Sequence, residues 1–172
     1  MPRSHKPRKR YVPKRVELDT VSLAHGQASL LQPAQRRDLV LPMLHAFERL
    51  RIGQGTGADW ANLADAMNVA ERLAQLNIAS DRLPEFMGAQ AVLAELHGRA
   101  QQRGSYTMRG PEIAALATAV ELHEVQLEVC TQGEVAQAIT TVQRCVSQAL
   151  AGNASPAALL CHGGLGAATT HP

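Results

Sequence analysis

The clearest indication of the fold is residues 110–152, GPEIAALATAVELHEVQLEVCTQGEVAQAITTVQRCVSQALAG. Apolar residues recur here every three or four positions on both sides of Gly133, which is the periodicity of an amphipathic helix. Pro111 suits a first helical position and Gly152 suits a helix end. The segment therefore predicts two helices joined by a short turn at Gly133. A short turn favours an antiparallel hairpin. The expected hairpin contacts join Ile113, Leu116, Val120 and Leu127 to Val135, Ile139, Val142 and Val146.

Helical spacing continues upstream, in residues 33–53. Pro33 can begin a helix, and the stripe Leu39, Met43, Leu44, Phe47 and Leu50 follows it. Pro42 lies inside that stripe, where proline lacks a backbone donor and costs about 3 kcal/mol in a regular helix. We therefore expect the helix to break near Val40–Leu41.

Two more helices are predicted between residues 59 and 104. One is capped by Asp59 and extends to Ile78, and the other begins around 81–84 and stops by Gly104. Residues 63–69 could form a helix-turn-helix, but 70–74 continue the same helical pattern, which favours one continuous helix. The glycines of residues 53–57 lack the spacing of a phosphate-binding loop and predict a flexible connection.

The composition supports an all-α domain. The 172 residues contain only five aromatics, while alanine and leucine, both strong helix formers, dominate. We expect a small bundle of about five helices: a disordered basic arm at 1–16, a helical domain at 17–152 and a disordered tail at 153–172.

Charge is distributed unevenly along the chain. The first sixteen residues, MPRSHKPRKRYVPKRV, contain all three lysines and no acid, whereas the other 156 residues carry ten arginines against fifteen acids. Such an arm is typical of a tether to a polyanion, with a tyrosine available to stack on a base. The candidate nucleic-acid-binding residues are Arg3, Lys6, Arg8, Lys9, Arg10, Tyr11, Lys14 and Arg15. The alternatives for the arm are contact with an anionic protein or membrane surface, and a solvated tail with no specific role.

The patterns that would indicate a metal, a cofactor or catalysis are weak. Cys130, Cys145 and Cys161 lack the close pairing of structural zinc sites. His97 and His123 each lie two residues after a glutamate, whereas di-iron bundles use Glu-x-x-His, so core-edge histidines with a hydrogen-bond partner are expected. No nucleophile elbow or H-E-x-x-H motif is present. We expect no metal, no cofactor and no enzymatic activity.

The unpaired thiols and the absence of an export signal or a membrane-spanning run predict a soluble cytoplasmic protein, and we expect no membrane among its partners. The segments KPRKRY at 6–11 and AVELHEVQL at 119–127 resemble short helical open reading frames of bacterial phages and mobile elements. That resemblance implies an accessory bacterial protein and transfers no functional residues.

These observations predict a noncatalytic accessory protein. Its arm would contact DNA or RNA nonspecifically, and its helical body would bind protein, with a second copy of the chain among the candidates. The alternative is a protein–protein adaptor or regulator with no nucleic-acid role, whose arm docks on an acidic partner.

Overall fold

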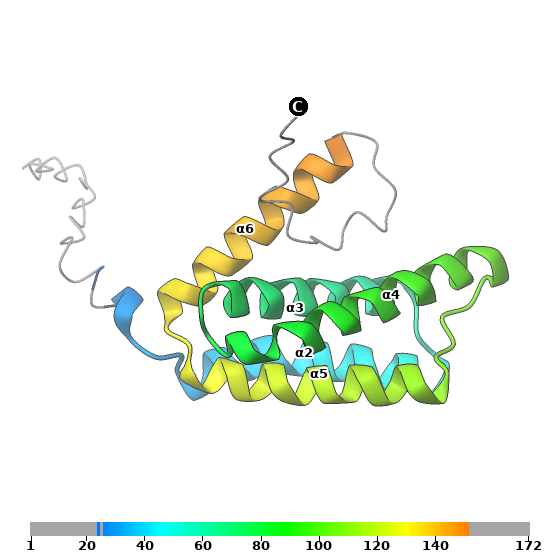
Figure 1. Cartoon of the computed structure of the whole chain (residues 1–172), viewed down its shortest axis with the longest axis horizontal. Helices are drawn as coiled ribbons and strands as arrows, with labels where there is room; N and C mark the ends of the chain where they lie inside the picture. The colour runs from blue at the N-terminus through cyan, green and yellow to red at the C-terminus, as the bar shows by residue number, and fades with distance from the viewer. Residues whose placement is uncertain (1–23, 25, 152–172) are drawn as a thin grey trace, which may run out of the picture.

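The fold is all-α, as the composition predicts. The structure, a computed structural model, describes residues 24 and 26–151 (Figure 1). A short helical stretch at 26–28 comes first, and the described residues form no strand. The named elements are α2 (Pro33–Arg51), α3 (Gly57–Gln75), the 3-10 helix η1 (Ser80–Arg82), α4 (Leu83–Arg103), α5 (Gly110–Val129) and α6 (Gln132–Ala151). The arm at 1–16 and the tail at 153–172 lie outside the described residues.

Helices α2 to α5 form a four-helix bundle. Each packs against the next, α5 closes the ring against α2, and α3 also touches α5 across the centre. The core between them is made mostly of leucine and alanine, with Phe86 and Trp60 as its large aromatic side chains. The indole Nε1 of Trp60 donates a hydrogen bond to the Leu93 carbonyl, 2.9 Å away, so this buried polar group is satisfied.

The predicted hairpin of the last two helices is wrong. Helix α6 packs mainly on α3 and rises away from α5 (Figure 1). Between α5 and α6 the chain is extended at Cys130, and Thr131 caps α6 through reciprocal contacts with Glu134. The same connection is hydrogen-bonded to an earlier segment, because Leu31 N–H donates to the Cys130 carbonyl and Gln132 N–H donates to the Ser29 carbonyl. These bonds turn α6 off the axis of α5 instead of folding it back.

The break expected near Val40–Leu41 is also absent, since α2 continues through Pro42. The carbonyl that loses its partner belongs to Asp38, and both Asp38 and Pro42 are exposed, so water can hydrate that group. Burial of Val40 and Met43 on the opposite face holds the helix on both sides of the proline.

The other boundaries are close to those expected. Helix α3 is continuous through 63–74, so the helix-turn-helix alternative is excluded. It begins earlier than predicted, with Thr56 as the N-cap and Asp59 in the first turn, and it ends at Gln75 instead of Ile78. Helix α4 stops at Gly104, whose φ of +73° is the left-handed conformation that glycine adopts at helix ends.

Candidate functional site

The arm residues proposed to contact nucleic acid lie outside the described residues, so the structure places none of them. The helical body contains ten arginines and no lysine between residues 24 and 151, and six of those arginines form ion pairs with carboxylates. The most buried pair joins Arg99 to Glu112 at 2.6 Å. Most of the positive charge of the body is therefore neutralised locally.

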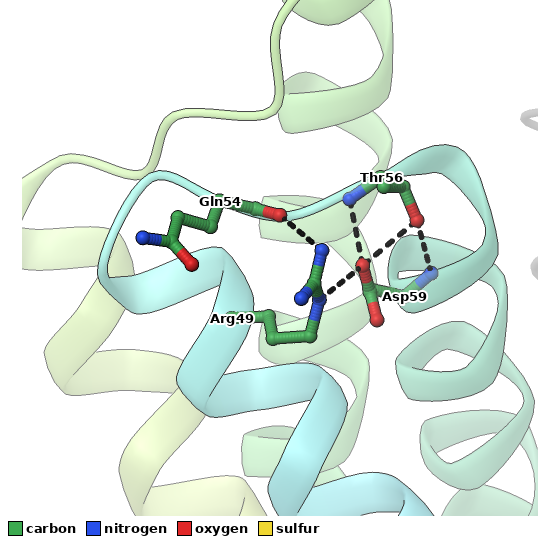
Figure 2. A network of polar contacts seen from close by, with 4 residues as sticks. All are labelled: Arg49, Gln54, Thr56 and Asp59. Atoms are coloured by element: carbon green, nitrogen blue, oxygen red, sulfur yellow. Dashed lines mark hydrogen bonds and ion pairs between the residues drawn. The ribbon is translucent and has the colours of Figure 1, made fainter.

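The loop between α2 and α3 is held in place and is not the flexible connection expected from its glycines (Figure 2). Arg49 donates from Nε to the Asp59 carboxylate at 3.1 Å and from its terminal nitrogen to the Gln54 carbonyl at 2.7 Å. The same carboxylate accepts the backbone N–H of Thr56 at 2.8 Å. Burial by itself raises the pKa of Asp59, but these bonds from Thr56 and Arg49 outweigh it and lower the pKa.

The N-terminus of α3 already has a negative charge beside it, from the Asp59 carboxylate in its own first turn. A helix N-terminus attracts negative charge because its first N–H groups are unpaired. Here Asp59 supplies that negative charge from within the helix, and the Arg49 guanidinium balances it. The loop therefore serves to fix α2 against α3.

Both core histidines have the hydrogen-bond partners that the sequence predicts. His97 lies between Tyr106, whose hydroxyl is 2.8 Å from Nδ1, and Gln101, whose amide is 3.2 Å from Nε2. His97 also stacks on Trp60 with ring centroids 4.3 Å apart. Burial lowers the pKa of His97. Since the Gln101 amide can only donate, this histidine is neutral and donates its Nδ1–H to Tyr106.

His123 is more deeply buried, and burial lowers its pKa to about 4. Its Nδ1 lies 2.8 Å from Oε1 of Gln126, which can only accept, so the proton is on Nδ1, and the lowered pKa keeps the ring neutral at pH 7. The amide of Gln126 donates to the carbonyls of Ala70 and Ile78 at 3.1 and 2.8 Å. Gln126 thus ties α5 to the end of α3.

A second buried glutamine joins α3 to α4. The Gln90 amide donates to Glu71 at 2.7 Å and to the Asn68 side chain at 3.2 Å. Neither glutamine was expected from the sequence. The sequence did contain a signal, because each glutamine occupies a position where the helical spacing predicts an apolar residue. In α4, for example, Gln90 lies on the same stripe as Phe86, Leu93 and His97.

A pocket of about 520 Å³ lies between α2, α3, α5 and α6. Its walls are mostly aliphatic, and Asp65 is one of the lining residues; its side chain is exposed to solvent, and partial desolvation by its neighbours raises the pKa of its carboxyl. The pocket exists because α6 leans away from α5, and so the residues expected to meet across a hairpin, Leu127, Ile139, Val142 and Val146, line a cavity.

A groove of about 580 Å³ runs between the outer sides of α2 and α5. Helix α2 contributes Arg36 and Arg37 to it, and α5 contributes three glutamates. Leu41 and Val125 lie between these charges and are 54% and 62% exposed. Sequence reasoning missed this surface. Its signal was an apolar residue outside the main stripe on each of two helices.

Cysteines and metals give no further site in the described part of the chain. Cys130 is buried, burial raises the pKa of its thiol to about 11, and the Glu134 carboxylate acts in the same direction. Cys145 is a free thiol on α6, and Cys161 lies outside the described residues. From residue 26 to residue 151, three or more potential metal ligands never converge.

Comparison of the chain with protein-family models, with curated proteins and with solved structures gave no match. None of the helices that the structure describes combines the length and the apolar character needed to cross a bilayer.

Proposed function

We propose that this chain is a noncatalytic accessory protein that contacts DNA or RNA through its basic N-terminal arm, while its helical body binds protein. The observation that carries the proposal is the separation of charge. Residues 1–16 hold seven basic side chains and no acid, and the other 156 residues have five more acids than arginines. A phosphate backbone attracts the first segment and repels the second.

The ion pairs of the body support the arm as the point of contact. Arg49 and Arg99 are committed to carboxylates in partly buried pairs, and Arg51 is held by Glu48 at 2.7 Å. A guanidinium that already has a carboxylate partner gains little from a phosphate, because one charge-assisted bond replaces another. The arm residues named above have no acid in their own segment to compete for them.

Salt-dependent binding tests the arm directly. If about five of its charges touch phosphates, log K plotted against log salt should have a slope near −4 to −5 on duplex DNA. Deletion of residues 2–15 should weaken binding to all sequences alike. Deletion of 153–172, which removes no lysine, arginine, aspartate or glutamate, is the matched control and should leave the slope unchanged. Equal binding by the arm deletion and the full chain would refute the proposal.

A second candidate function, a protein adaptor without a nucleic-acid role, is favoured by the groove between α2 and α5, where Leu41 and Val125 are exposed.

The substitution Tyr11→Ala helps to separate the two functions. Stacking on exposed bases is worth about 1–3 kcal/mol per base, so this change should weaken binding to single strands more than to duplexes. An adaptor would lose no nucleic-acid affinity, because it would have none.

A further inference from the structure

The surface formed by the outer sides of α2 and α5 has an unusual combination of exposed aliphatic side chains and segregated charge. We call it the α2–α5 face. Its residues are Arg36, Arg37, Leu41 and Leu44 on α2 and Glu121, Glu124, Val125 and Glu128 on α5, and the exposed Val129 follows one helical turn after Val125. Val125 and Val129 are each 62% exposed and Leu41 is 54% exposed. Contiguous exposed apolar side chains with a charged rim are typical of protein interaction sites.

The charges of this face are sorted by helix. Arg36 of α2 pairs with Glu128 of α5 at 3.2 Å, so the start of α2 lies beside the end of α5 and the two helices are antiparallel. Arg37 has only a 3.9 Å contact with its neighbour Asp38, and both side chains are exposed. Glu124 forms no ion pair with any of the residues that the structure describes. One edge of the face is thus positive and the other negative.

This arrangement is complementary to itself. A two-fold axis that runs along the groove, parallel to the helices, lays α2 of one copy over α5 of the other and keeps their levels along the axis. Arg37 of each copy then lies opposite the glutamates of its partner, and Leu41 lies opposite Val125. A two-fold axis perpendicular to the helices in the interface plane would instead lay α2 on α2 and α5 on α5, and so would not bring Arg37 opposite the glutamates.

We infer that the α2–α5 face joins two copies of this chain as an isologous dimer. The inference deepens and rests on the protein-binding half of the proposed function, naming a second copy as the partner, and it does not depend on the arm. The face itself spans about two turns of each helix, roughly 12 Å, and the outer sides of α2 and α5 continue beyond it to roughly 30 Å, so the interface would include the flanking turns. Two adjacent helices spaced about 8–10 Å apart offer a face approaching the roughly 800 Å² per partner of a standard interface.

Dimer formation would also strengthen the binding of the arms to a polyanion. Two basic arms attached to one particle contact one polyanion together, and the second contact is then intramolecular. Arm binding and dimer formation are separable, because the arm at 1–16 and the α2–α5 face share no residue.

Charge reversal on the full-length, nuclease-treated protein tests the inference. Sedimentation equilibrium should show a dimer for the natural sequence. Arg37→Glu sets acid against Glu124, and Glu124→Arg sets base against Arg37, so each variant alone should dissociate at least about tenfold more readily. In an equimolar mixture both contacts become complementary again, and the heterodimer should form. That rescue also shows that both variants are folded.

Arg103→Glu and Glu95→Arg are the matched controls, because they reverse exposed charges on α4, away from the face. They should dimerise alone and gain nothing from mixing. A natural chain that stays monomeric would overturn the inference, as would a dimer unaffected by Arg37→Glu. Neither result affects the proposal for the arm, because the salt dependence of nucleic-acid binding is measured separately. Conversely, nucleic-acid binding that does not depend on salt would contradict the arm proposal and would not contradict a dimer that responds to charge reversal.

Discussion

Replacing Gln126 with leucine should destabilise the bundle by several kcal/mol, because a buried amide that joins α5 to α3 is lost. Gln126 lies on α5, is 1% exposed, and bonds to residues 48 and 56 positions earlier in the chain. Leucine has nearly the same volume, so the change removes hydrogen bonds without opening a large cavity. The variant therefore isolates the polar contribution of this contact.

The expected cost follows from the three bonds that disappear. Gln126 donates to the carbonyls of Ala70 and Ile78 and accepts the Nδ1–H of His123. A lost bond costs about 1 kcal/mol where the other group keeps a partner or meets water, and about 1–3 kcal/mol where a buried group is left unpaired. Ala70 keeps its helical partner within α3, and Ile78 is only half-buried, so His123 is the buried group left unpaired. We expect a loss of about 3–5 kcal/mol, a large part of the roughly 5–15 kcal/mol typical of a domain.

Urea unfolding at neutral pH, followed by far-ultraviolet circular dichroism and by the fluorescence of Trp60, measures this loss. Gln137→Leu is the control, because Gln137 is exposed on α6 and should change stability by less than about 0.5 kcal/mol. If Gln126→Leu also fell within about 0.5 kcal/mol, the buried amide would not be holding α5 to α3, and the reasoning would fail.

Three other outcomes are expected. The pKa of His123 is lowered from 6.5 to about 4. Between pH 6.5 and 4 this imidazole is therefore protonated in the unfolded chain and neutral in the native chain. Stability should fall by up to about 3 kcal/mol as the pH drops through that window, and His123→Gln should show a shallower fall in urea titrations. With the other two cysteines changed to serine, Cys130 should resist Ellman's reagent at pH 8 until urea unfolds the protein, because its thiol is buried with a pKa of about 11. Gly55→Ala should lower the melting temperature, since the added Cβ would overlap the Leu50 side chain, and the cost should be about 1–3 kcal/mol.

Local sequence patterns are enough to predict that the protein is helical and where most helices begin and end. Apolar spacing and a few punctuating residues, such as Pro111 and Gly104, are local signals, and helix formation is a local event. The buried histidines were found in the same way, because a stripe of one helix shows which side chains face inward. Local signals led to the wrong prediction of a helix break at Pro42, because the cost of an interior proline depends on whether the carbonyl that loses its hydrogen bond is exposed to water.

Which helix faces meet depends on contacts between residues that are distant in the sequence. The hairpin was a reasonable inference from the short turn at Gly133, but the hydrogen bonds of Ser29 and Leu31 with the Cys130–Gln132 connection turn α6 onto α3. Gln126 finds its carbonyl partners only through folding, for they are distant in sequence. The α2–α5 face likewise exists only once the two helices lie side by side, when Leu41 and Val125 join two sorted rows of charge. Helix periodicity identifies the side of a helix that is buried, and three-dimensional packing alone determines what covers it.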